Sequence, residues 1–199
     1  MVNGMSTLAP PAQLAVAYAH LSVRPSFSLL LEIDNRLHGI IKNSREPMVA
    51  QIKMAWWREA FENSPNARPK GEPLLQALND VGDVIPSAAL ESLVSAWEIL
   101  LGSEHWARDA VAAHAALRSD AIFQTYAQWV STKQDVQAAG QAWATDALRQ
   151  EFPDRFPKDL QRGNVPSLRS RKLRPLSILN MSVRTSSGPR LIWHALTGL

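Results

Sequence analysis

The sequence predicts an all-α fold, and three observations support this prediction. Apolar residues recur at the three- and four-residue spacing of amphipathic helices, prolines stand where several helices should begin, and no alternating pattern of convincing length indicates a strand. Hydrophobic residues make up 46% and charged residues 20% of the 199 residues, which is typical of a globular protein. We expect one domain over residues 1–199, large enough to bury a core.

The first part of the chain contains helices that are separated by short turns. Residues 11–21 open with proline and are rich in alanine and leucine, and residues 26–42 form a second, amphipathic helix. A third helix at 47–62 also begins with proline, whose missing N–H needs no partner in the first helical turn. The segment 63–73 is rich in turn-forming residues, and a short helix follows it at 73–80.

The second part continues the helical pattern until prolines interrupt it. A helix at 86–101 begins with Pro-Ser and is closed by Gly102. Further helices are expected at 104–118, 120–131 and 134–150. Prolines at positions 153 and 157 then break the pattern, so that 153–199 forms a basic, partly irregular segment. Within it we expect an irregular stretch at 163–176 and a last short helix near 188–197.

Two charged residues fall among apolar residues when the second and third helices are projected at 100° per residue. Asp34 lies at the edge of an apolar face, and Lys53 belongs to a helix that is apolar on nearly all sides, which predicts a central position for that helix. Buried charges need a partner, and the short turn at 43–46 makes the two helices antiparallel neighbours. We therefore expect Asp34 and Lys53 to face each other; the alternative is that each lies at a helix edge and reaches water.

A resemblance to a known family enters at residues 45–58, REPMVAQIKMAWWR, which are similar to the REP-x-x-x-Q-x-R/K-x-x-WWR segment of bacterial squalene/phytoene synthase-like proteins. The preceding helix, LLLEIDNRLHGII, looks like the first core helix of that family. The segment AGQAWATDALR and residues 173–199 look like its short, divergent branch. The resemblance implies a reduced isoprenoid-synthase-type helical bundle. It also marks five residues as cavity-facing or as family signature: Asp34, Lys53, Trp56, Trp57 and Arg58.

The enzymes of this family join two prenyl diphosphates head to head, with two aspartate-rich motifs that hold Mg²⁺. Carboxylates four residues apart share a helix face, yet residues 36–43 contain no carboxylate and no D-x-x-x-D follows residue 100. The nearest approaches, at positions 80 and 83 and at 59 and 62, lie in a glycine-containing turn and beside a loop. We expect no catalytic residue, no metal site and no cofactor, with Mg²⁺ needed only if the chain is an enzyme.

The resemblance thus implies a non-catalytic protein, either an assembly factor of the kind that serves respiratory complex I or a factor that binds an apolar or prenyl ligand. The alternative is a head-to-head prenyl transferase with unusual ligands for its metal. No glycine-rich phosphate loop, H-E-x-x-H or G-x-S-x-G motif and no pair of histidines four residues apart indicates another chemistry.

Charge is unevenly distributed along the chain. Residues 160–199 hold seven basic and no acidic residues, whereas residues 1–159 hold 14 basic and 18 acidic residues, a net charge of −4. We expect the basic end to bind an anionic partner, either membrane headgroups or a protein, through Arg169, Arg171, Lys172 and Arg174. The alternative is that it docks on its own acidic body. Trp193 is the single aromatic residue of this end, so nucleic-acid binding is not expected.

The absence of cysteine favours a reducing compartment. No apolar run reaches the roughly 18 residues that a membrane span needs, and the first residues lack the basic and apolar regions of a secretory signal. These features predict a cytoplasmic protein, peripheral to the membrane if the basic end binds headgroups.

Overall fold

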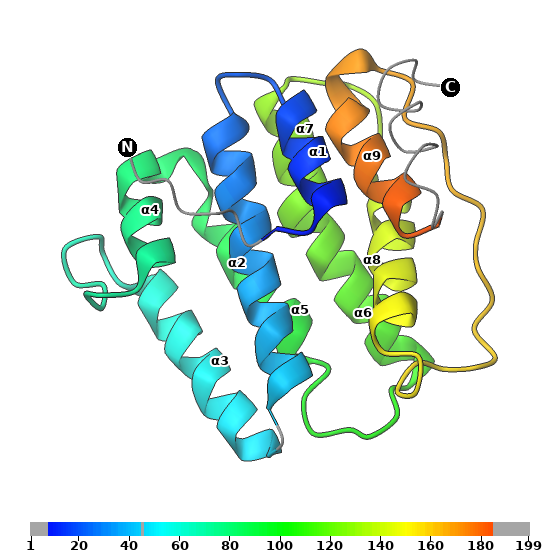
Figure 1. Ribbon diagram of the computed structural model, residues 1–199, viewed down its shortest axis with the longest axis horizontal. Coiled ribbons are helices and arrows are strands. Elements are labelled where there is room, and N and C mark those ends of the chain that lie inside the picture. Colours follow the sequence, from blue (N-terminus) through cyan, green and yellow to red (C-terminus); the bar gives the residue numbers. More distant parts are fainter. Residues whose placement is uncertain (1–7, 45, 185–199) are drawn as a thin grey trace.

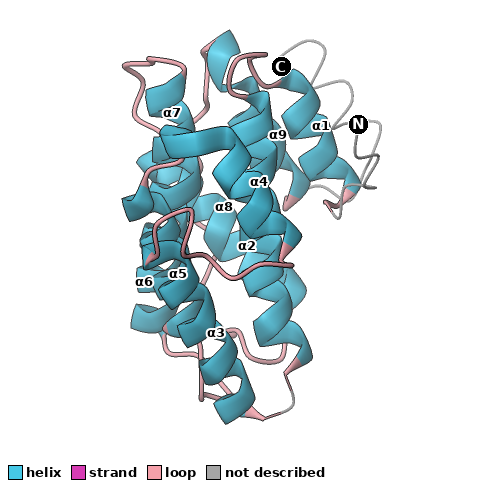
Figure 2. Ribbon diagram, turned by 90° about the vertical axis from the view of Figure 1, so that its left-hand side faces the viewer, coloured by secondary structure: helices cyan, strands magenta, loops and turns pink. Residues whose placement is uncertain are grey.

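The computed structural model describes residues 8–44 and 46–184, and within them it contains helices and loops but no strand, as predicted (Figures 1 and 2). The helices are α1 (Pro10–Tyr18), α2 (Arg24–Asn43), α3 (Pro47–Glu62), α4 (Pro73–Val81), α5 (Ser87–Glu98), α6 (Arg108–Ser119), α7 (Thr125–Trp129), α8 (Gln137–Glu151) and α9 (Arg174–Ser182). Short 3₁₀ turns lie at Gly82–Val84 and Arg171–Leu173. None of these described helices is both long and apolar enough to cross a bilayer.

Helix α2 is the central helix of the bundle. It is 20 residues long, contacts α1, α3, α4 and α5, and buries Phe27, Leu30 and Leu37 completely. Helix α6 packs against both α5 and α8, and α1 packs on α9 beside the upper half of α2 (Figure 1). The buried apolar side chains of these helices form one connected core.

One continuous helical rod replaces the two helices that were predicted between residues 104 and 131. Helix α6 starts at Arg108, and a π-helical segment, Asp120–Gln124, joins it to α7. The backbone stays helical at both junctions, with φ −61° and ψ −45° at Asp120 and φ −59° and ψ −47° at Thr125. A π-helical turn inside a helix is uncommon and often lies beside a functional site. Here it directly follows the last turn of α6.

The rod and α8 lie close together at Gly140. A Cβ atom on Gly140 would lie 2.1 Å from Ser119 Oγ and 2.8 Å from Phe123 Cγ, so a larger residue would force the two helices apart. One turn later, the Trp143 ring packs on Phe123 with 5.3 Å between ring centroids. The π-helical segment is therefore clamped against α8.

Helix α3 lies at the edge of the bundle, so the prediction of a central position was wrong (Figure 1). One stripe of α3 faces the bundle and is buried: Ala50, Met54, Trp57, Ala60 and Phe61. Large apolar side chains elsewhere on the helix are exposed to solvent: Met48, Val49, Ile52 and Trp56. The apolar residues all round α3 therefore belong to two groups, one buried against the bundle and one exposed to solvent.

An irregular connection over residues 152–170 runs from α8 to α9 along the outer side of α8 (Figure 1). The predicted irregular stretch 163–176 is correct up to residue 170, but α9 begins at Arg174, where no helix was predicted. Pro175 occupies its first turn, and Leu176 and Leu179 are buried in the core. The helix that was predicted near 188–197 lies outside the described residues.

Gly140 and Gly39 offer a matched test of this packing, because both lie inside helices. Gly140→Ala should lower the free energy of unfolding by about 1–3 kcal/mol, the usual cost of overpacking. Gly39→Ala should raise it by about 0.5–1 kcal/mol, because its Cβ would meet Asn43 Nδ2 at an ordinary 3.8 Å and alanine is the better helix former. Urea unfolding measures both, and a neutral Gly140→Ala variant would contradict the close approach.

Candidate functional site

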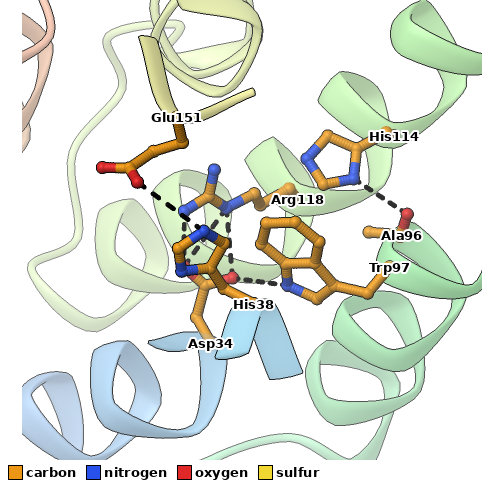
Figure 3. A network of polar contacts seen from close by, with 7 residues as sticks. All are labelled: Asp34, His38, Ala96, Trp97, His114, Arg118 and Glu151. Atoms are coloured by element: carbon orange, nitrogen blue, oxygen red, sulfur yellow. Dashed lines mark hydrogen bonds and ion pairs between the residues drawn. The ribbon is translucent and has the colours of Figure 1, made fainter. Parts of the chain in front are cut away.

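A buried ion pair joins Asp34 on α2 to Arg118 on α6 at the centre of the bundle (Figure 3). The two residues are 4% and 8% exposed. Arg118 Nε lies 3.1 Å from Oδ1 of Asp34, and Nη2 lies 2.7 Å from Oδ2, so the guanidinium binds the carboxylate in a bidentate manner. Trp97 Nε1, on α5, donates to Oδ1 at 2.9 Å. The same Nε–H also lies 3.2 Å from Oδ2, so three N–H groups make four contacts with the two carboxylate oxygens.

The Arg118 guanidinium is also held between two indole rings. Its Cζ lies 5.0 Å from the Trp97 ring centroid and 4.2 Å from that of Trp143 on α8. A cation over an aromatic face is attracted by the ring quadrupole, more strongly when water is excluded. One guanidinium therefore connects α2, α5, α6 and α8.

His114 lies one turn before Arg118 on α6 and is fully buried. Its Nδ1 lies 2.8 Å from the carbonyl oxygen of Ala96, and because a carbonyl can only accept, Nδ1 carries the proton. Burial, reinforced by the positive charge of Arg118, lowers the pKa of His114 to about 3. His114 is therefore neutral at physiological pH.

His38 and Glu151 form the polar edge of this cluster (Figure 3). His38 packs on Trp97, with 5.3 Å between ring centroids, and its Nε2 lies 4.0 Å from Glu151 Oε2. Burial and the charge of Arg118 lower the pKa of His38. Lys42 donates to Glu151 at 2.8 Å, and this hydrogen bond lowers the pKa of the Glu151 carboxyl. The charges of the cluster thus cancel in two pairs, and both histidines are neutral.

This cluster lines a central pocket of about 310 Å³, with walls from α1, α2, α5, α6, α8 and α9. Its polar lining consists of a few groups, among them Asn35, His38, Arg118 and Glu151. The rest is largely apolar and includes two tryptophans. A concave, mainly apolar space with a few converging polar groups is the usual form of a small-molecule site between the helices of a bundle.

The predicted pairing of Asp34 with Lys53 is wrong. Asp34 does require a partner, as expected for a buried charge, but Arg118 supplies it from α6. Lys53 is exposed, because the stripe of α3 that faces the bundle runs through Met54 and Trp57 instead. Lys53 is therefore the helix-edge residue of the alternative interpretation.

Lys53, Trp56 and Trp57 line a second site, an open groove of about 850 Å³ between α2, α3 and the start of α4. We call it the α2–α3 groove. Its apolar walls include Ile40, Ile52, Pro73 and Leu74. Trp56 is exposed and packs edge-on against the buried Trp57, with 5.1 Å between ring centroids. The structure thus brings three of the five family-signature residues to one groove and places Asp34 elsewhere.

Arg58 is the remaining signature residue, and it connects helices instead of lining the groove. It forms an ion pair with Glu98 on α5, and its Nη2 lies 3.1 Å from Ser95 Oγ. Arg36 has a comparable role on the other side, where its Nη1 lies 2.9 Å from Glu72 Oε2 at the start of α4. These two pairs fix α3 and α4 against the bundle.

The four basic residues that were predicted to bind an anionic partner are only partly free. Arg169 and Arg171 are exposed, but Lys172 Nζ donates to the carbonyl of Val130 at 3.0 Å, and Arg174 starts α9. Part of the basic end thus docks on its own body, as the alternative interpretation held. Binding of membrane headgroups stays a prediction.

Several residues of the central cluster were not predicted from the sequence: Trp97, His114, Arg118 and Trp143. A usable signal was present, because His114 and Arg118 stand four residues apart in an alanine-rich helix and therefore share one face. Across residues 8–44 and 46–184, no three or more histidine, aspartate or glutamate side chains gather into a group that could hold a metal ion.

Comparison of this chain with known proteins gives no match among family models, curated proteins or solved structures. The resemblance to squalene/phytoene synthase-like proteins consequently rests on the sequence segments themselves, of which 45–58 is the most specific. Any function must be argued from the geometry of the central pocket and the α2–α3 groove.

The Asp34–Arg118 pair can be tested with a double-mutant cycle. Asp34→Ala or Arg118→Met alone should lower the free energy of unfolding by about 3–5 kcal/mol, because each leaves an unpaired buried charge. The double variant should cost clearly less than the sum. Lys53→Met, at the exposed position, should change stability by no more than about 0.5 kcal/mol. Strict additivity in urea unfolding would show that the two residues are not coupled.

His114 should make stability dependent on pH. Its pKa is lowered to about 3 in the folded protein, so below pH ~6.5 the unfolded chain takes up a proton that the folded chain does not. Lowering the pH from 7.5 to 5 should therefore lower the free energy of unfolding by about 2 kcal/mol through this group.

His114→Asn should flatten that pH dependence by a similar amount in urea unfolding, because asparagine does not titrate. His105→Asn is the control, since His105 also contacts a backbone carbonyl through Nδ1, at 3.1 Å, but is exposed. A His114→Asn variant with the wild-type pH slope would contradict the assignment.

Proposed function

We propose that this protein is a non-catalytic, squalene/phytoene synthase-like protein that binds a prenyl-type ligand, an apolar chain with an anionic head, in the α2–α3 groove. The observation that carries the proposal is the exposed apolar lining of this groove. Ile52 is 64% exposed and Trp56 38% exposed, although both are large apolar side chains on a well-packed helix. An exposed apolar patch of this kind usually marks a binding surface.

The size and the apolar part of the lining suit an apolar chain. The groove is open to solvent and, at about 850 Å³, is larger than the central pocket. Its apolar side chains come from Ile40 on α2 and from α3 and the start of α4, beside polar groups of α2, so an apolar chain would contact three helices. Burial of apolar surface from both sides would then drive binding.

Three charged side chains line the groove, Glu32, Arg36 and Lys53, and Glu32 accepts a hydrogen bond from Ser28 Oγ at 3.1 Å. Lys53 is exposed in the lining, next in sequence to Ile52, and extends a mobile ammonium group on an apolar stem. The guanidinium of Arg36, also in the lining, is already paired with Glu72. Lys53 is therefore the group that we expect to contact the head of the ligand.

The central cluster supports the non-catalytic part of the proposal. The helix that resembles the first core helix has one buried carboxylate, Asp34, which lies at the bundle centre. Arg118 and Trp97 donate hydrogen bonds to its two oxygens. A carboxylate so occupied would have to lose these bonds before it could coordinate Mg²⁺. The assembly role that the resemblance implies stays a prediction.

Native mass spectrometry of the protein mixed with farnesyl phosphate tests the proposal. The complex should form, and Trp56→Ala or Ile52→Gln should weaken it about tenfold, through the loss of about 1.4 kcal/mol of apolar contact. Ala147→Phe, which narrows the central pocket, should leave binding unchanged. If Ala147→Phe lost binding while Trp56→Ala and Ile52→Gln kept it, the ligand would have to bind in the central pocket. Mg²⁺-dependent turnover of farnesyl diphosphate would favour the prenyl transferase alternative.

A further inference from the structure

A second buried carboxylate, Asp146 on α8, is surrounded by three arginines. Asp146 is 2% exposed. Arg184 Nε lies 3.0 Å from Oδ2, and Arg162 Nε and Arg149 Nε lie 3.4 Å and 3.7 Å from Oδ1. We call these four residues the Asp146 cluster. Its three cations face one anion, so the cluster carries a net charge of +2.

The fold brings these arginines together from three separate segments. Arg149 follows Asp146 by one turn of α8, Arg162 belongs to the irregular connection, and Arg184 follows the end of α9. Arg184 Nη2 also donates to the carbonyl of Gly163 at 2.9 Å, which ties the end of α9 to the connection. Such an arrangement places like charges side by side, which is unfavourable unless an anion lies between or beside them.

Several hydrogen-bond donors of the cluster are left over. Nε and Nη2 of Arg149 and Nε of Arg184 are buried but make no hydrogen bond within the described structure. Arg184 Nε lies 3.0 Å from Asp146 Oδ2 and forms an ion pair with it, and this carboxylate oxygen is itself buried without a hydrogen bond, so the donors that are left over belong mainly to Arg149. Unsatisfied buried donors are costly, and charged ones more so. Asp146 alone does not satisfy the three guanidinium groups.

The arginines remain reachable from solvent although Asp146 is not. Their side chains are 24%, 50% and 29% exposed at Arg149, Arg162 and Arg184, so an ion could approach the exposed guanidinium atoms from outside, whereas the unsatisfied nitrogens of Arg149 and Arg184 are buried and would have to turn toward it. Arg149 is also held in place, because its Cζ lies 4.7 Å from the Phe156 ring centroid. A guanidinium fixed by stacking loses less freedom when it binds an anion.

We propose that the Asp146 cluster binds a phosphate-type oxyanion. A phosphate group carries a charge of about −1.5 to −2 at pH 7, which matches the surplus of the cluster, whereas a carboxylate would neutralise only half of it. Guanidinium groups bind phosphate oxygens through paired N–H donors. The cluster shares no residue with the α2–α3 groove or the lining of the central pocket, so this site is independent of the proposed function.

Titration calorimetry with inorganic phosphate, at constant ionic strength set with chloride, tests this site. Wild type should bind, and Arg162→Gln and Arg184→Gln should each bind about tenfold more weakly, because each removes charge-assisted hydrogen bonds. Lys158→Gln is the control, because it also removes one positive charge, at an exposed residue of the same irregular connection, and should bind like wild type. Equal affinities in all four proteins, or no binding by wild type, would overturn the proposal.

Asp146→Asn separates a binding role from a structural one. It leaves three guanidinium groups without their carboxylate, so phosphate should raise the melting temperature of this variant more than that of wild type. An equal or smaller increase would show that the arginines serve only to hold Asp146.

Vesicles that contain phosphatidic acid identify the source of the phosphate group. If the protein binds these vesicles and inorganic phosphate reverses the binding, the ligand is a lipid headgroup. If the protein binds phosphate but not the vesicles, the ligand is a free phosphate compound.

Discussion

The ion pair between Asp34 and Arg118 is the constraint on which the centre of this bundle depends. Two charges so deeply buried would each be strongly unfavourable alone, so the surrounding side chains must satisfy both at once. Trp97 completes the carboxylate from α5, and Trp143 covers the guanidinium from α8. A displacement of any of the four helices would break one of these contacts. We therefore interpret the pair as fixing the relative positions of the helices more than as adding net stability, since a buried ion pair contributes little of the latter.

The same guanidinium also determines the chemistry of the central pocket. Its positive charge, together with burial, lowers the pKa of both His38 and His114, so neither histidine adds a charge at neutral pH. Glu151 stays ionised because Lys42 donates to it. The pocket is consequently polar along one wall but electrically balanced. A charged ligand gains little there, which is one reason why we assign the anionic head of the proposed ligand to Lys53 in the α2–α3 groove.

Helix periodicity accounts for what could be predicted from the sequence. Most helices begin and end within a few residues of their predicted limits, because apolar spacing and proline position report local structure directly. The need of Asp34 for a partner was also predictable, but the identity of Arg118 was not, since the two residues are 84 positions apart and nothing local selects one cation over another.

Helix α3 shows a second limit of what the sequence can predict. Apolar residues all round a helix indicate either a central helix or an edge helix with an exposed apolar face, and composition alone cannot distinguish them. Helix α9 was missed because a basic, proline-containing segment conceals a short buried apolar face.

The two buried aspartates show how the number of cations around a carboxylate separates a structural role from a binding role. Asp34 and Asp146 are similarly buried, at 4% and 2% exposure. Asp34 faces one guanidinium that is directed at it through aligned hydrogen bonds, and the pair is neutral and closed. Asp146 faces three guanidinium groups, with buried N–H donors left over and the arginine side chains partly open to solvent. If both carboxylates served only to hold helices together, one arginine would neutralise Asp146, and the two further arginines would add repulsion between like charges beside the contacts that they make. Their presence is consistent with an external anion that completes the cluster. The ion pairs of Arg162 and Arg184 with Asp146 hold part of the basic C-terminal segment against α8.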